Sequence, residues 1–160
     1  MPRARVPPDS TLSPLYYVFA ASQQAKLLVG EALAGAELTG EEYAVYSALR
    51  ELEPATPTEL ARHLGMPVTT ALDYVRSMLR KEHAAKLAHP RDQRSYHLKL
   101  TKAGHRAHDD TARLFERADL RLSAQLGTKR AAIIRALADL LDAGEAAIDE
   151  FRAANTDRTG

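Results

Sequence analysis

The chain has 160 residues, 45 % of them hydrophobic, which predicts one compact domain with a real core and excludes a disordered chain. Cysteine is absent, which excludes a disulfide framework, a thiolate zinc site and a thiol-based redox switch. The formal net charge is only +1. The sequence has no apolar run long enough to span a membrane, and its basic, proline-broken N-terminus is unlike a secretory signal, so we expect a cytoplasmic protein.

The charge is distributed unevenly along the chain. Nine basic residues fall between Arg76 and Arg106, where the acids are Glu82 and Asp92, whereas residues 31–59 carry seven glutamates and a single base. A concentration of positive charge in one third of a chain is typical of a surface that meets a polyanion such as nucleic acid. A merely solvated basic face is the alternative.

Capping signals mark the helix starts in the first half of the chain. Thr39 with Glu42 and Thr56 with Glu59 are capping boxes, and glycine at Gly65 can end a helix in the left-handed conformation. Prolines at helix starts and apolar residues at helical spacing complete the pattern. The predicted helices cover residues 14–35, 39–52, 57–64 and 67–81.

The pattern then changes to that of a β-hairpin. Residues 84–88 are a weak strand candidate, residues 89–94 are polar and turn-like, and residues 95–100 alternate apolar and polar side chains, as a half-buried strand does. Two helices follow, separated at Gly127. The last helix carries a heptad seam, formed by Ile134, Leu137, Leu141, Gly144, Ile148 and Phe151.

Two short helices joined by a turn at Gly65 have the size of a helix-turn-helix. The polar face of the second helix, at about 67–81, has side chains suited to base edges and phosphates, namely Thr69, Thr70, Asp73, Arg76, Ser77 and Arg80. Arg91 and Arg94 flank the hairpin tip, where Asp92 can brace Arg94 or the turn backbone. An amphipathic helix pair with an ordinary polar face is the alternative, but the basic hairpin favours DNA binding.

These residues resemble the MarR-type winged-helix transcriptional regulators. The wing pattern of that family is Asp-Pro-x-Asp-x-Arg, a short strand, then Leu-Thr-x-x-Gly. The similarity covers roughly residues 14–152. It is carried by Leu64-Gly65, Pro90, Asp92, Arg94, Leu100-Thr101 and Gly104.

The chain departs from the family pattern at three points. Glu82-His83-Ala84 stands where the family usually has glycine and two apolar residues, which predicts a short or irregular first wing strand. Pro67 replaces the usual serine or threonine cap of the recognition helix, which shifts or weakens that cap. His89 replaces the usual Asp or Asn at the start of the wing.

The resemblance implies a mainly α fold with a small β-hairpin wing. It implies one domain over 1–160, in which residues 39–104 form the winged helix-turn-helix lobe and the N- and C-terminal helices, 14–36 and 105–152, form a dimerisation region. The recognition helix, about 67–81, would lie in the major groove. The wing, about 84–100, would place Arg94 in the minor groove.

The aromatic residues are concentrated in the first two predicted helices. Core packing explains Tyr16, Phe19, Tyr43 and Tyr46 most simply. The alternative is a pocket for an aromatic or anionic effector, which the family resemblance would place between the dimerisation region and the DNA-binding lobe. The effector's identity does not follow from these residues.

No motif of an enzyme, a cofactor or a metal site accompanies these features. His105 and His108 lie three apart on a predicted helix, but the six histidines are explained most simply as scattered and exposed. We therefore expect a non-enzymatic DNA-binding regulator that binds a pseudo-palindromic operator in double-stranded DNA as a homodimer. The resemblance implies a repressor, since repression is the commoner outcome in the family. The alternative is a helical dimer whose basic hairpin binds an acidic protein partner.

Overall fold

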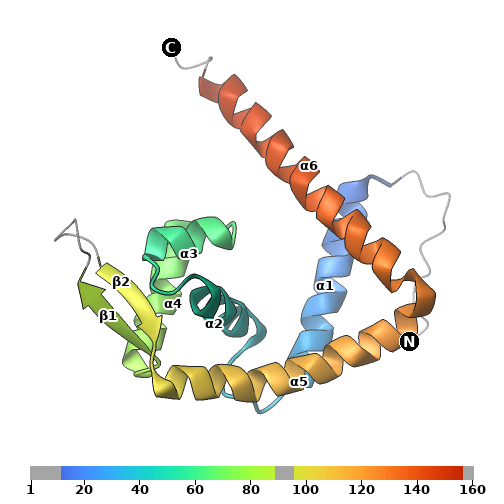
Figure 1. Ribbon diagram of the computed structural model, residues 1–160. Coiled ribbons are helices and arrows are strands. Elements are labelled where there is room, and N and C mark those ends of the chain that lie inside the picture. The colour runs from blue at the N-terminus through green and yellow to red at the C-terminus, as the bar shows by residue number, and fades with distance from the viewer. Residues whose placement is uncertain (1–11, 89–95, 157–160) are drawn as a thin grey trace. The chain divides into compact units, whose positions relative to one another are not determined.

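The computed structural model describes residues 12–88 and 96–156, and it divides the chain into two compact units, Met1–Ala118 and Asp119–Gly160 (Figure 1). The mainly helical fold with one two-stranded antiparallel hairpin confirms the predicted fold class. The elements are α1 (Pro14–Ala32), α2 (Gly40–Leu52), α3 (Pro57–His63), α4 (Val68–Arg80), β1 (Ala84–Ala88), β2 (Tyr96–Leu100), α5 (Lys102–Leu126), the 3-10 turn η1 (Gly127–Lys129) and α6 (Arg130–Thr156).

Both predicted capping boxes are present. The Thr39 side chain accepts a hydrogen bond from the Glu42 amide at 3.1 Å, and the Glu42 carboxylate accepts one from the Thr39 amide at 3.1 Å. Thr56 and Glu59 repeat the arrangement at 3.2 and 2.7 Å. Each box satisfies backbone donors that a helix start would otherwise leave unpaired. The sequence therefore determines where α2 and α3 begin.

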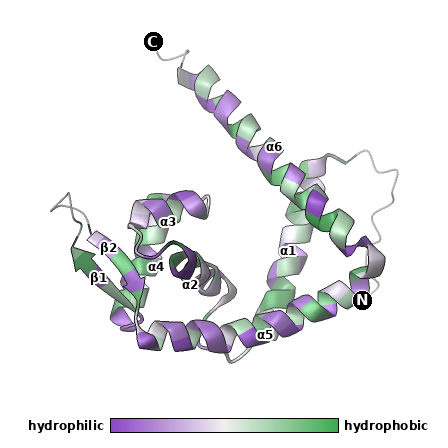
Figure 2. Ribbon diagram, viewed as in Figure 1, coloured by the Kyte–Doolittle hydropathy of each residue, from purple (hydrophilic) through white to green (hydrophobic). Residues whose placement is uncertain are grey.

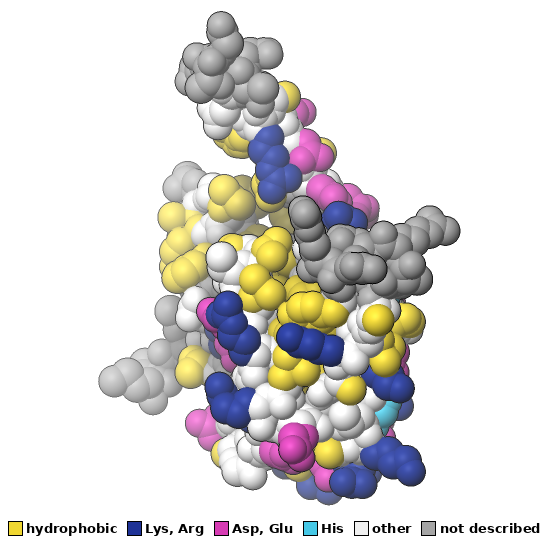
Figure 3. All heavy atoms as spheres, turned by 90° about the vertical axis from the view of Figure 1, so that its left-hand side faces the viewer, with side chains coloured by type: hydrophobic (Ala, Val, Ile, Leu, Met, Phe, Trp, Pro, Cys, Tyr) yellow, Lys and Arg dark blue, Asp and Glu magenta, His cyan; other side chains and the backbone are white. Residues whose placement is uncertain are grey.

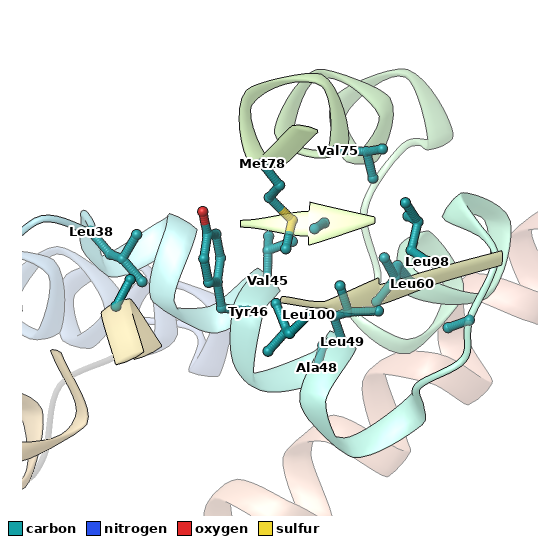
Figure 4. Packing of buried hydrophobic residues seen from close by; sticks show 13 residues of the cluster. Leu38, Val45, Tyr46, Ala48, Leu49, Leu60, Val75, Met78, Leu98 and Leu100 are labelled. Atoms are coloured by element: carbon teal, nitrogen blue, oxygen red, sulfur yellow. The ribbon is translucent and has the colours of Figure 1, made fainter. Parts of the chain in front are cut away.

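The core of the first unit is built around α2 (Figure 4). Tyr46 and Leu49 from α2 are at most 1 % exposed, and they belong to one cluster with Leu60 of α3, Met78 of α4 and Leu98 of β2. Burial of such side chains stabilises a fold by about 1.5–3 kcal/mol each. One shared core thus holds the helix-turn-helix and the hairpin together.

The first wing strand is regular, so the expectation of a short or irregular strand is wrong. All five residues of β1 pair with β2, from Ala84 opposite Leu100 to Ala88 opposite Tyr96. The reason is that Glu82 itself takes the left-handed conformation, with φ 57°, which glycine adopts more readily. The backbone of His83 is then anchored by a 2.8 Å hydrogen bond from its amide to the Met78 carbonyl.

The second unit contains the end of α5 and all of α6. Along α6, hydrophobic and hydrophilic residues alternate around the helix (Figure 2). The large apolar side chains of the heptad seam are exposed in the single chain, with Leu141 and Phe151 both at 74 %. None of the helices within residues 12–88 and 96–156 is long and apolar enough to cross a membrane.

Candidate nucleic-acid interface

α3 and α4 form the predicted helix-turn-helix. Gly65 takes φ 61° in the turn, and the Met66 amide donates to the Ala61 carbonyl at 3.0 Å, which closes the end of α3. Val75 and Met78, on the inner face of α4, are each 1 % exposed. As expected from Pro67, the N-terminus of α4 has no side-chain cap among the described residues. Core packing, rather than capping, therefore fixes this helix.

The outer face of α4 carries the polar residues predicted to read DNA. Thr69, Thr70, Asp73, Arg76 and Arg80 are exposed, and Ser77 is half-buried. Arg76 Nη1 donates to Asp73 Oδ1 at 2.7 Å, and Arg80 Nη2 lies 3.4 Å from Ser77 Oγ. The structure brings all six onto one side of one helix. Lys and Arg side chains also occupy several places on the hairpin side of the molecule (Figure 3).

The C-terminal end of α4 is anchored to α2. Lys81 Nζ donates to Glu42 Oε1 at 2.8 Å, and both side chains are at most one-third exposed. Partial burial acts to raise the pKa of the Glu42 carboxyl, but the hydrogen bonds from Lys81 and the Thr39 amide outweigh it and lower that pKa. α4 is therefore held by an ion pair in addition to its apolar face.

The start of the wing is anchored through His83, which is 7 % exposed. Its Nδ1 lies 3.0 Å from the Tyr46 hydroxyl, and its Nε2 lies 3.2 Å from Glu37 Oε1. Burial, together with the Glu42 and Glu37 carboxylates, raises the pKa of Tyr46, so the hydroxyl keeps its proton. These contacts connect the junction of α4 and β1 to α2 and to the segment before it.

A second buried histidine lies on α5. His108 is 8 % exposed, stacks on Tyr43 with a centroid distance of 5.1 Å, and has Nε2 3.1 Å from Ser47 Oγ. Arg50 donates to His108 Nδ1 at 2.9 Å and also pairs with Asp109. The expectation of scattered, exposed histidines is wrong for His83 and His108, because each joins a polar network that fixes α2. Sequence spacing alone gave no signal of these partners.

Side-chain contacts join the two strands at the base of the wing and tie β2 to the end of α2. Lys86 Nζ lies 4.2 Å from the centroid of the Tyr96 ring, a cation–π arrangement across the two strands. The Leu100 amide donates to Glu53 Oε2 at 2.8 Å. The hairpin tip, with the candidate residues Arg91, Asp92 and Arg94, lies outside the described residues.

The four aromatic residues that the sequence suggests for an effector pocket do not line a common cavity. Tyr46 is buried in the core, Tyr43 packs between His108 and Phe115, and Tyr16 and Phe19 are 47 % and 63 % exposed on α1. A cavity of about 440 Å³ lies instead among α1, α2 and α5, and none of these four lines it. Its lining residues are Ala25, Lys26, Val29, Gly30, Leu33, Thr39, Gly40, Glu41, Ala44 and Phe115.

The described residues contain no cluster of three or more His, Asp or Glu side chains suited to a metal ion. Their polar side chains are instead engaged with one another and with the backbone, as at Glu42, His83 and His108.

Solved structures similar to this chain decide the fold. MarR from E. coli, in its apo form, matches with a TM-score of 0.70 and 20 % identity, over 82 % of this chain and 98 % of that one. The repressor CouR, bound to a DNA duplex, matches with a TM-score of 0.76 and 23 % identity, over 81 % and 92 %. The fold is that of the MarR regulators. The resemblance found in the sequence is thus confirmed in three dimensions.

Two further comparisons bear on the MarR fold of this chain. PcaV from Streptomyces coelicolor, solved with its natural ligand, matches with a TM-score of 0.71 and 23 % identity, over 88 % of this chain and 97 % of that one. Residues 33–98 match the family model described as sugar-specific transcriptional regulator TrmB. A search of curated protein sequences finds no match.

Proposed function

We propose that the protein is a sequence-specific, DNA-binding transcriptional regulator that acts as a repressor. The observation that carries this proposal is the construction of α4. Its inner face is buried, its C-terminal end is tied to Glu42 through Lys81, and its outer face presents hydroxyl, carboxylate and guanidinium groups to solvent. A rigid helix with such a face fits the major groove, where these groups distinguish base pairs.

The polar residues of α4 and of the wing offer different chemical groups to the bases and phosphates of DNA. Thr69, Thr70 and Ser77 offer hydroxyls to bases or phosphates, and Arg80 offers a charge near the end of α4. In the wing, the family resemblance implies that Arg94 enters the minor groove. Arg91, on the other side of the hairpin tip, would add a phosphate contact, and Asp92 would brace Arg94 or the turn backbone. Each phosphate contact makes the affinity for DNA fall with salt.

The protein binds its operator as a homodimer in this proposal. The supporting observation is the number of large apolar side chains that single-chain folding leaves exposed on α1 and α6, including Leu15 at 76 % and Leu141 at 74 %. Contiguous exposed apolar side chains on soluble proteins mark interaction surfaces. A two-fold dimer would read two half-sites about 34 Å apart, which predicts a near-palindromic operator of roughly two helical turns.

A small effector is proposed to occupy the cavity among α1, α2 and α5. Its volume of about 440 Å³ is in the range of small-molecule sites, and apolar walls such as Val29, Leu33 and Phe115 suit an aromatic body. Lys26 supplies a cation for an anionic group. The similar protein PcaV was solved with its natural ligand, which supports the existence of such a site in this fold.

The test is selection from a randomised duplex-DNA pool by the purified full-length protein, followed by sequencing of the retained DNA. Enrichment of a two-fold symmetric motif of about two turns supports the proposal. Retention without a motif would instead indicate a non-specific basic surface. No retention at low salt would overturn the proposal and favour an acidic protein partner for the hairpin. Arg94→Ala should weaken operator binding while folding stays intact, which separates the wing contact from α4.

A further inference from the structure

The carboxylate of Asp73 lies in a part of the chain where most charged residues are basic. Within residues 67–88 and 96–106, the acids are Asp73 and Glu82, and Glu82 occupies the turn before β1. Asp73 is on the outer face of α4, and its side chain is 73 % exposed. A carboxylate there repels phosphate oxygens, so it weakens DNA binding of every sequence unless it has a more specific role.

The contact that Asp73 makes is with Arg76, one helical turn away. Arg76 Nη1 donates to Asp73 Oδ1 at 2.7 Å, whereas Arg80 on the same face lies at a long 3.4 Å from Ser77 Oγ. Exposed ion pairs between residues three apart add little to the stability of a fold. Any role of the Asp73–Arg76 pair is therefore to be sought in the orientation of the Arg76 side chain rather than in the stability of the fold.

Resting on the proposed function, we infer that Asp73 is a positioning residue that sets sequence preference by holding the Arg76 guanidinium for a guanine. A guanidinium has five N–H donors, of which the Asp73 contact uses one. The others suffice for the paired hydrogen bonds to guanine O6 and N7 that arginine commonly makes in the major groove. Because the arginine is already oriented, less side-chain entropy is lost when the base is bound.

The carboxylate adds to selectivity in a second way. When Arg76 meets guanine, its charge stays paired with Asp73 while two more of its N–H groups donate to the base. When Arg76 meets another base, the arginine loses base contacts while the carboxylate still repels the backbone. Asp73 thus lowers binding to non-cognate DNA more than binding to the operator. This differs from direct reading of a cytosine amino group by Asp73, which the same chemistry allows.

The experiment is pool selection with the wild-type protein, Asp73→Asn, Arg76→Gln and the double variant. We expect a guanine in each half-site of the wild-type motif, discriminated by roughly fivefold to hundredfold. Arg76→Gln should lose that guanine. Asp73→Asn should weaken the preference at the same base pair while binding non-cognate duplex at least as tightly as the wild-type protein. The double variant should resemble Arg76→Gln alone.

The matched control is Asp110→Asn. Asp110 and Arg113 form another exposed ion pair three residues apart, but on α5. Removal of this carboxylate changes the net charge equally and should leave the base preference intact. Two outcomes would overturn the inference without touching the proposed function: loss of preference at a different base pair, or a uniform change of affinity with an unchanged motif. A wild-type protein that selects no motif would overturn the proposed function itself.

Discussion

The backbone carbonyl oxygen of His83 fills the space that a β-carbon on Gly104 would need. The same carbonyl accepts a hydrogen bond from the Thr101 amide at 3.0 Å, so the start of α5 lies directly against the turn between α4 and β1. The obstacle is backbone, which cannot rotate aside as a flexible side chain can. This packing gives a physical reason for glycine at the end of the Leu100-Thr101-x-x-Gly104 motif.

Gly104→Ala should destabilise the protein by about 3 kcal/mol, at the upper end of overpacking costs, because either α5 or the wing junction must move. Urea unfolding at fixed protein concentration measures the change. Gly30→Ala is the matched control, since Gly30 is also helical and nothing lies within 4 Å of its added β-carbon. The control should be neutral or stabilising by up to about 1 kcal/mol. Equal stability of both variants would contradict the packing argument.

Glu82→Gly should raise the free energy of unfolding by about 0.5–1 kcal/mol. Glu82 has φ 57°, and the left-handed conformation costs a residue with a β-carbon about 1–2 kcal/mol, part of which glycine loses again as backbone entropy. Glu82→Ala retains the β-carbon and serves as the control, and it should give no such gain. A stabilisation of equal size in both variants would mean that the side chain, rather than the backbone conformation, is responsible.

Local signals in the sequence predicted nearly all of the architecture. Capping boxes at Thr39 and Thr56 and the strand alternation that ends at Leu100 depend on neighbours within a few residues, and the helices and strands begin and end within one turn of the predictions. The hydrogen bonds of His83 and His108 join residues 37 and 61 positions apart. The periodicity of the sequence does not reveal partners that are so far apart along the chain. The sequence therefore predicts, wrongly, that these two histidines are exposed.

The sequence also predicts part of the candidate site, again because the relevant signals lie within a few residues of one another. The six polar residues of α4 share one face because helical spacing places them there, and core packing of Val75 leaves that face outward. The pairing of Asp73 with Arg76 requires rotamers, and the cavity beside Phe115 requires the relative placement of three helices. Neither the ion pair nor the cavity can be predicted from composition. For this reason the aromatic residues of the sequence predict an effector pocket whose lining differs from that of the cavity in the structure.

Acid should destabilise the contact between α2 and α4 through Glu42. The pKa of this carboxyl is lowered in the folded protein, so its stabilising effect is complete above the ordinary value of 4.5 and is lost as the pH falls through the lowered value. The difference in unfolding free energy between the wild-type protein and Glu42→Gln should therefore shrink between about pH 6 and pH 3. Urea titrations across this range measure it.

Glu41→Gln is the control for the acid effect, because it removes a neighbouring, exposed carboxyl charge and leaves the Glu42–Lys81 contact in place. Its pH profile should follow that of the wild-type protein. A constant difference between the wild-type protein and Glu42→Gln across the pH range would show that the charge of Glu42 does not stabilise the lobe.

Dimer formation is predicted to depend on the apolar seam of α6. Leu141→Glu places a carboxylate in the middle of that seam, and a symmetric dimer would bury two of them, so dimerisation should weaken by at least about a hundredfold, or ~3 kcal/mol. Ala146→Glu adds the same charge away from the seam by helical spacing and should remain dimeric. Sedimentation equilibrium distinguishes the two. If Leu141→Glu stays as dimeric as Ala146→Glu, the seam is not the interface. If Leu141→Glu becomes monomeric, its affinity for an operator with two half-sites should also fall, because each half-site is then bound independently.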